Sequence, residues 1–131
     1  RPDGPIIGGK MPALCNMVAE MDSAWRGHWK AIVTERPLAD SAKSRHRWRR
    51  VQPLHKIARD LKRLADKRDV DLARLAVPTL RVQFAQLLSN TADVIEQVAA
   101  FCGLRPTDEQ IAAALASVSP ELNHHTTIQK V

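Results

Sequence analysis

An arginine and two serines in one short stretch have the types and spacing to bind a phosphate group. In "AIVTERPLADSAKSRHRWRR", Arg36 follows an apolar run, and Ser41 and Ser44 lie in the helical pattern after it. A guanidinium forms paired, charge-assisted hydrogen bonds with phosphate oxygens, and a serine hydroxyl donates without adding charge. A helix that begins near Pro37 would direct unpaired backbone N–H groups at the same place. The stretch therefore predicts a phosphate site.

This chemistry depends on where the fold places Arg36. The preceding residues "KAIVT", 30–34, are apolar and rich in β-branched side chains, which predicts a buried strand. Helices on both sides of it in the sequence favour a parallel strand. In open α/β sheets, ligands bind beyond the carboxyl ends of the strands, and Arg36 stands at such an end. The alternative interpretation is an arginine that pairs with Glu35 or with a surface carboxylate.

Hydrophobic periodicity and turn residues give the remaining elements. They predict helices over about 11–24, 37–48, 53–68, 91–102 and 107–118, and a second strand over 79–84. Thr107 and Gln110 have the spacing of a capping box, and Gly103 is placed to end the helix before it. Residues 121–131 have no clear period and are expected to form a tail. The alternation of strands and helices predicts an α/β fold with few parallel strands and mostly helical flanks.

Composition limits the class of protein. The 131 residues suffice for a single domain with one core, and the hydrophobic fraction of 44% argues against disorder. No apolar run reaches the ~18–20 residues needed to cross a bilayer, and the first residues do not form a signal peptide. The two cysteines, Cys15 and Cys102, lie in apolar helical patterns, which indicates buried free thiols. No zinc-type spacing is present. We therefore expect a cytoplasmic protein without a membrane span or a metal.

The net charge of +6 indicates an anionic partner: nucleic acid, a membrane surface or a phosphorylated small molecule. A nucleic-acid patch is one reading of the basic run that contains an aromatic residue, namely Lys43, Arg45, His46, Arg47, Trp48, Arg49 and Arg50. These charges wrap several faces of one predicted helix. We therefore prefer a solvated face, or a rim that attracts an anionic ligand.

The segment "IVTERPLADSAKS" resembles the one that holds the 3′-phosphate of the donor nucleotide in sulfotransferases. These enzymes transfer a sulfuryl group from 3′-phosphoadenosine 5′-phosphosulfate (PAPS). The family pattern is an apolar strand, an Arg, and a Ser eight residues later, which Arg36 and Ser44 match. Ser41 is an extra hydroxyl outside that pattern. The resemblance implies that these residues bind PAPS, or adenosine 3′,5′-bisphosphate, without a metal.

Two further segments extend the resemblance to roughly residues 6–120. "IIGGKMPALC" resembles the family's Gly-Lys-x-Pro segment, and it places Lys10 as a further candidate for the nucleotide cleft. "LRVQFAQLLSNTADVIEQVAAFCGL" resembles the late strand, loop and helix of the family. The implied fold is part of a P-loop-type three-layer sandwich. The implied activity is sulfuryl transfer to a hydroxyl or amine acceptor whose identity stays open.

The chain also departs from the family pattern. Phe84, Ala85 and Gln86 stand where Tyr-Glu-Asp is expected. Residues 1–10 contain no Gly/Ser/Thr-rich phosphate loop, and the usual His or Glu base is missing. The resemblance thus implies the second half of a sulfotransferase domain, inactive alone, with an N-terminal half on another piece, or else a shortened descendant. The alternative is a non-catalytic structural or interaction protein on the same scaffold, in which Trp25 would be a core residue.

Overall fold

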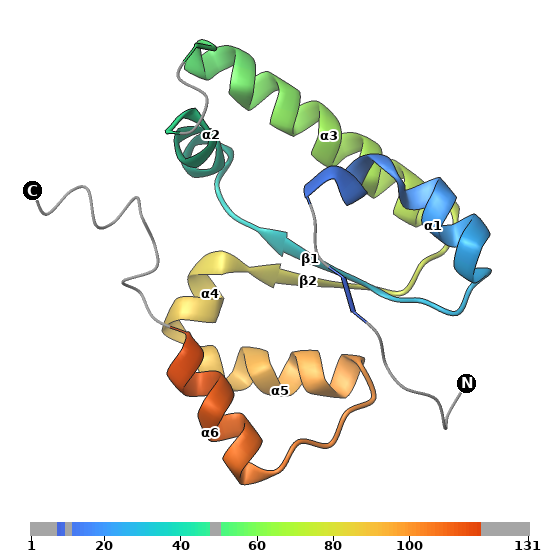
Figure 1. The fold of residues 1–131 in the computed structure, drawn as a ribbon, viewed down its shortest axis with the longest axis vertical. Helices are drawn as coiled ribbons and strands as arrows, with labels where there is room; N and C mark the ends of the chain where they lie inside the picture. The colour runs from blue at the N-terminus through green and yellow to red at the C-terminus, as the bar shows by residue number, and fades with distance from the viewer. Residues whose placement is uncertain (1–7, 10–11, 48–50, 119–131) are drawn as a thin grey trace, which may run out of the picture.

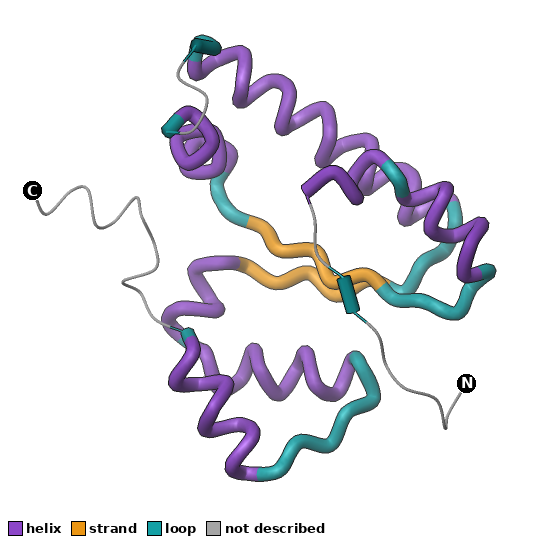
Figure 2. Tube along the Cα trace, in the orientation of Figure 1, coloured by secondary structure: helices purple, strands orange, loops and turns teal. Residues whose placement is uncertain are grey.

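The computed structural model describes residues 8–9, 12–47 and 51–118. Helices make up most of this part of the chain, and two strands lie between them (Figure 2). In chain order the elements are the 3₁₀ helix η1 (Pro12–Asn16), α1 (Val18–Trp25), β1 (Ala31–Glu35), α2 (Leu38–His46), α3 (Leu54–Arg74), β2 (Thr79–Gln83), α4 (Phe84–Ser89), α5 (Thr91–Phe101) and α6 (Asp108–Ser117).

The strands β1 and β2 pair in parallel, with a register that runs from Ala31 opposite Thr79 to Glu35 opposite Gln83. The chain passes through α2 and α3 between them, as a parallel pair requires. Figure 1 shows α1, α2 and α3 on one side of the strand pair and α4, α5 and α6 on the other. The predicted α/β class with parallel strands is confirmed. The P-loop-type sandwich stays a prediction, because the sheet in the described part of the chain has two strands.

Each face of the strand pair contacts helices. Val33 of β1 is buried in a cluster with Val18 of α1, Leu72 of α3 and Val77, which precedes β2. Because successive side chains in a strand point to opposite faces, Val82 of β2 points away from this cluster. It is also buried, on the side where α5 packs against β2. Burial on both sides fixes the position of the strands and of the residues that follow them.

Helix α3 is longer than the sequence pattern predicts. Its apolar stripe continues to Leu72, which is 4% exposed, so the helix persists to Arg74 instead of ending near residue 68. Its outer face carries ion pairs one turn apart, Lys62 with Asp66 and Lys67 with Asp71. Exposed pairs of this kind add little to the stability of a helix. Tertiary burial of one stripe therefore decided the length of α3.

The predicted helix boundaries in the C-terminal third are confirmed. The Thr107 side chain accepts a hydrogen bond from the Gln110 backbone, and the Gln110 side chain accepts one from the Thr107 backbone. This is the reciprocal capping box. Gly103 has a φ of +71° after the end of α5, and the next N–H, of Leu104, donates to the carbonyl of Ala99. A left-handed residue with this bond defines a Schellman motif.

The N-terminal helix prediction is wrong in detail. The predicted helix over 11–24 is divided into η1 and α1, because Met17 takes a non-helical φ of −121°. Trp25 is 52% exposed and is not a core residue. Trp25 is the last residue of α1. Its ring packs against the ring of Trp29, and the two ring centroids are 6.1 Å apart. Trp29 is the more buried of the two and donates a hydrogen bond from Nε1 to Asp22.

Other predicted features differ less. Helix α2 ends at His46, and α4 begins directly at Phe84, which the sequence pattern placed at the end of the strand. Cys15 and Cys102 are free thiols but are half-buried instead of fully buried. Within the described ranges, no helix combines the length and the apolar character needed to cross a bilayer.

Candidate functional site

Arg36 lies at the carboxyl end of the parallel strand pair. It follows β1 directly, and Phe84 follows β2 directly. The register pairs Glu35 with Gln83, so the next residues, Arg36 and Phe84, lie beside each other past the sheet. The guanidinium carbon of Arg36 lies over the Phe84 ring, 4.6 Å from its centre. Helices α2 and α4 leave this sheet end in opposite directions (Figure 1).

The side chain of Arg36 is half-buried, and its Nε atom is buried. Contact with an aromatic face restricts where a guanidinium lies and is favoured by attraction between the cation and the ring. Phe84 thus provides a platform that holds Arg36 at the sheet end. An arginine whose position is fixed in advance loses less side-chain freedom when it binds an anion.

The carboxylate of Glu35, the residue before Arg36, accepts hydrogen bonds from two side chains of β2. One of its oxygens accepts a hydrogen bond from Arg81 at 2.6 Å, and the other accepts from the side-chain amide of Gln83. Arg81 also pairs with Asp69 of α3 at 3.2 Å. The hydrogen bonds to Glu35 and Asp69 raise the pKa of Arg81. Both oxygens of Glu35 therefore take part in hydrogen bonds between β1 and β2.

Two hydroxyls follow Arg36 on α2. Ser41 and Ser44 are both half-buried, and neither side chain hydrogen-bonds to another residue in the described ranges. Serine and threonine in helices often donate to a carbonyl of the preceding turn, as Ser89 does to Ala85 and Thr91 does to Leu87. The hydroxyls of Ser41 and Ser44 remain available as donors to a ligand.

The first turn of α2 adds both donors and a negative charge. The N–H groups of Asp40 and Ser41 donate to the carbonyl of Pro37. The amides of Leu38 and Ala39 precede these bonds and carry the positive end of the helix dipole. Asp40 is an acidic residue in this first turn. Its carboxylate stabilises the helix start but opposes the binding of an anion there.

Three of the predicted site residues lie along one segment, from the end of β1 through α2. Arg36 lies at the start of α2, Ser41 in its second turn, and Ser44 toward its end. Lys10 lies outside the described residues. The contact of the Phe84 ring with Arg36 was not among the features expected from the sequence. A signal for it existed, because the carboxyl ends of two parallel strands meet at one edge, and both residues follow such strands.

The described part of the basic run does not form one exposed face. Lys43 and Arg47 are exposed, whereas Arg45 and His46 are half-buried. Trp48, Arg49 and Arg50 lie outside the described ranges. Across the residues that the structure describes, no group of three His, Cys, Asp or Glu side chains is arranged to hold a metal ion.

We compared the chain with protein-family models, curated proteins and solved structures. No family model matches, and neither curated proteins nor solved structures give a significant match.

Proposed function

We propose that this chain binds the 3′-phosphate of a PAPS-type nucleotide at the carboxyl end of β1 and β2, as part of a sulfotransferase. The observation that carries the proposal is the place of Arg36: it stands past two parallel strands, over Phe84 and at the start of a helix. Ser44, at the family spacing, supplies a hydroxyl from the same helix. Ser41 is a second hydroxyl that the family pattern does not require.

In this function the chain positions the donor nucleotide. During sulfuryl transfer, a bond forms between sulfur and the oxygen or nitrogen of the acceptor. The bond between sulfur and the 5′-phosphate oxygen breaks, a base takes the acceptor proton, and adenosine 3′,5′-bisphosphate leaves. Arg36 and Ser44 would act on the distant 3′-phosphate, so their contribution is orientation of the reacting group. A partner N-terminal half would supply the phosphate loop and the base, and the acceptor stays unassigned.

The test is the binding of adenosine 3′,5′-bisphosphate to the chain by calorimetry, with adenosine 5′-monophosphate as the comparison ligand. The monophosphate lacks the 3′-phosphate, and we expect it to bind about 10- to 100-fold more weakly than the bisphosphate. This factor corresponds to charge-assisted hydrogen bonds of roughly 1.5–3 kcal/mol. Arg36→Gln should lower the affinity for the bisphosphate by a similar factor. It should leave the affinity for the monophosphate nearly unchanged.

Matched variants separate a specific site from general attraction by a basic protein. Lys43→Gln removes an exposed charge from the same helix and should change the affinity by less than about 3-fold. Ser44→Ala should weaken binding more than Ser41→Ala does. The proposal would be contradicted if Arg36→Gln and Lys43→Gln lowered the affinity for the bisphosphate equally. It would also be contradicted if the parent chain bound the bisphosphate and the monophosphate with equal affinity.

The same experiment addresses nucleic acid. An affinity for oligonucleotides that falls steeply with salt and exceeds the affinity for the bisphosphate would favour the nucleic-acid interpretation of the basic run. Absence of binding to either ligand would favour a non-catalytic scaffold.

A further inference from the structure

An apolar groove of about 340 Å³ lies between α5 and α6. These two helices are on the side of the strand pair away from α3 (Figure 1). Half-buried aliphatic side chains supply much of the lining, among them Leu87 of α4, Ile95 of α5 and Ile111 of α6. Leu104, in the loop between α5 and α6, also lines the groove and is 49% exposed. This accessible surface favours an apolar ligand.

Helix α6 is apolar on more sides than the rest of the described chain covers. Its residues 111–116 are all apolar, and at 3.6 residues per turn they surround the helix. Even so, α6 has no fully buried residue in the described structure. Leu115 lies one turn after Ile111 and is 37% exposed. A helix that is apolar all round is normally covered by other protein, so α6 is suited to contact with another polypeptide.

The extent of the apolar surface favours a helix as the ligand. Beside the row formed by Ile111 and Leu115 lies a second row, formed by the exposed residues Ala112 and Ala116. Together with the groove, these rows form a surface wider than a small molecule seated in the groove would cover. Alanine side chains allow a second helix to approach closely, because side-chain size sets the distance between packed helices. An amphipathic helix places every third or fourth side chain into such a groove.

The charge of this part of the chain is opposite in sign to that of the whole chain. Residues 84–118 contain one basic residue, Arg105, and four acidic residues, Asp93, Glu96, Asp108 and Glu109. Residues 119–131 add one Glu and one Lys, so the net charge of residues 84–131 is −3, against +6 for the whole chain. Charge complementarity therefore favours a basic partner and opposes pairing of this face with the same face of a second copy.

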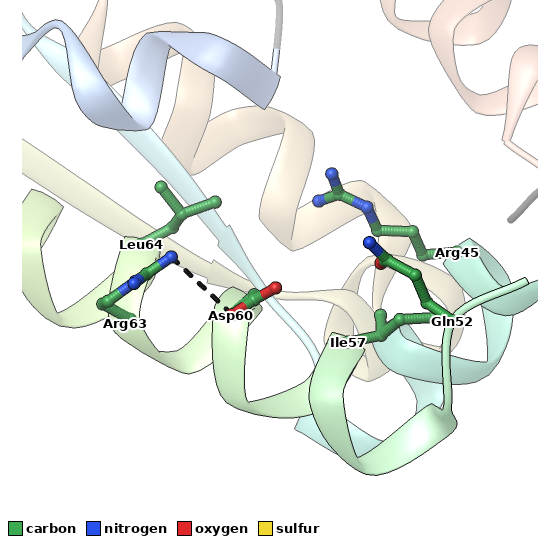
Figure 3. Close-up of a pocket in the computed structure, with 6 residues that line it drawn as sticks. All are labelled: Arg45, Gln52, Ile57, Asp60, Arg63 and Leu64. Atoms are coloured by element: carbon green, nitrogen blue, oxygen red, sulfur yellow. Dashed lines mark ion pairs between the residues drawn. The ribbon is translucent and has the colours of Figure 1, made fainter.

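The cavity beside Arg45, between α2 and α3, has a different character. Its volume is about 180 Å³, and polar side chains make up most of its lining (Figure 3). Asp60 and Arg63 form an ion pair there, with 3.6 Å between the paired atoms. Apolar side chains would displace water from these polar groups at a cost. The groove between α5 and α6 therefore suits apolar side chains better than this cavity does.

We propose that the groove between α5 and α6 binds a basic amphipathic helix of a partner protein. The apolar side chains of that helix lie against Ile95, Ile111 and Leu115, and its Lys and Arg side chains are attracted by the net negative charge of this part of the chain. The proposal does not rest on the nucleotide site, because α2 and α5 lie on opposite sides of the strand pair (Figure 1).

The test is an NMR titration of the ¹⁵N-labelled full chain with a helical peptide of about 15 residues, which carries Leu at every third or fourth position and Lys on its other face. This peptide should cause saturable shifts confined to the amides of residues 87–115. A peptide of the same composition with its leucines spread over all faces should bind at least about 10-fold more weakly. The net charge of +6 repels Lys peptides from the chain as a whole, so binding at α5 and α6 would not be general attraction.

Variants test the assignment of the apolar contact. Leu115→Gln and Leu104→Gln change exposed side chains, so the fold should persist, and each should weaken binding of the Lys peptide by about 5-fold or more. The matched control is Val70→Gln, which changes an exposed apolar residue of α3 and should alter the affinity by less than about 2-fold.

Further variants test the charge. Glu96→Gln, on α5, should weaken binding of the Lys peptide by about 2-fold at low salt, and high salt should remove the difference. Glu20→Gln, an exposed change on α1, is the control and should leave the affinity unchanged. A peptide with Glu in place of Lys should cause no shifts in residues 87–115, because its charge has the same sign as that of this part of the chain.

Three results would overturn the proposal: no saturable shifts in residues 87–115, equal binding of the two Lys peptides, or equal effects of Leu115→Gln and Val70→Gln. The first of these is also expected if residues 119–131 fill the groove. A dimer of the chain that Leu115→Gln dissociates would assign the face to a second copy and would likewise overturn it. Arg36→Gln should leave peptide affinity unchanged, so a failure here is distinguishable from a failure of the nucleotide site.

Discussion

The guanidinium carbon of Arg36 lies 4.6 Å from the centre of the Phe84 ring, and this contact joins the carboxyl ends of β1 and β2. Phe84, at the end of β2, thereby restricts the position of the Arg36 guanidinium at the end of β1. Phe84 is followed by the uncharged residues Ala85 and Gln86, so no carboxylate comes directly after the ring in the sequence.

The first prediction concerns this contact. Phe84→Leu keeps an apolar side chain but removes the attraction between cation and ring, which contributes about 0.5–1 kcal/mol at partly exposed sites. We expect a loss of stability of at least that size and a decrease of about 3-fold in affinity for adenosine 3′,5′-bisphosphate. Urea unfolding of Phe84→Leu, Arg36→Gln and the double variant measures the coupling free energy between the two side chains. Strictly additive losses would show that the contact contributes nothing.

The second prediction concerns Asp40 in the first turn of α2. Asp40→Asn removes a negative charge next to the proposed phosphate position, and we expect affinity for the bisphosphate to rise about 2- to 5-fold at low salt. The same change should lower stability by about 0.3–1 kcal/mol, because the carboxylate favours the helix start.

The control for Asp40 is Asp93→Asn, a matching change in the first turn of α5. It should reproduce the small loss of stability and leave nucleotide affinity unchanged. An unchanged affinity in Asp40→Asn would mean that no phosphate binds near the start of α2.

The third prediction concerns pH. Burial of Asp69 raises the pKa of its carboxyl, but hydrogen bonds from Arg68 and Arg81 outweigh this and leave the pKa lowered. The hydrogen bond from Lys67 lowers the pKa of Asp71. An ordinary aspartate has a pKa of about 3.9, so on acidification the unfolded chain takes up protons first. The stabilisation is complete above about pH 5 and is lost as the pH falls below 4.

Urea midpoints between pH 6 and pH 2.5 measure this dependence. Arg81→Met should lower stability at neutral pH by about 1 kcal/mol, a small value because the Arg81 side chain is 43% exposed. It should also make the acid-induced loss shallower, because one donor to Asp69 is removed. An identical slope in the variant and the parent chain would exclude Arg81 as a cause of the lowered pKa.

The fourth prediction concerns two helix ends of the same type. Ala76 follows α3 with a φ of +53°, and the N–H of Val77 donates to the carbonyl of Leu72. Gly103 occupies the equivalent position after α5. The left-handed conformation is unfavourable for a residue with a Cβ by roughly 1–2 kcal/mol. Part of this is offset by the greater freedom of glycine in the unfolded chain.

Ala76→Gly should therefore raise stability by up to about 1 kcal/mol, and Gly103→Ala should lower it by a similar amount. Nothing lies within 4 Å of a Cβ built on Gly103, so the effect there comes from the backbone and not from a clash. Thermal unfolding compares the two variants. Changes of the same sign would contradict the explanation.

Much of the local structure could be read from the sequence. The β-branched run before Glu35 predicted a strand, and Thr107 with Gln110 predicted a helix start, because both signals act between near neighbours in the chain. The position of Arg36 at a sheet end followed from the same local patterns. The sequence also identified Ser41 and Ser44 as hydroxyls on the helix after it.

Tertiary structure decided what distant segments do to one another. Leu72 is buried in the same cluster as Val33, and this burial extends α3 beyond the predicted end. Trp25 is exposed at the end of α1, although its apolar spacing predicted a core residue. The contact of Arg36 with Phe84 and the cavity beside Arg45 exist only once elements far apart in the sequence pack together. Hydrophobic periodicity shows which face of an element is apolar, but packing alone selects the partner of that face.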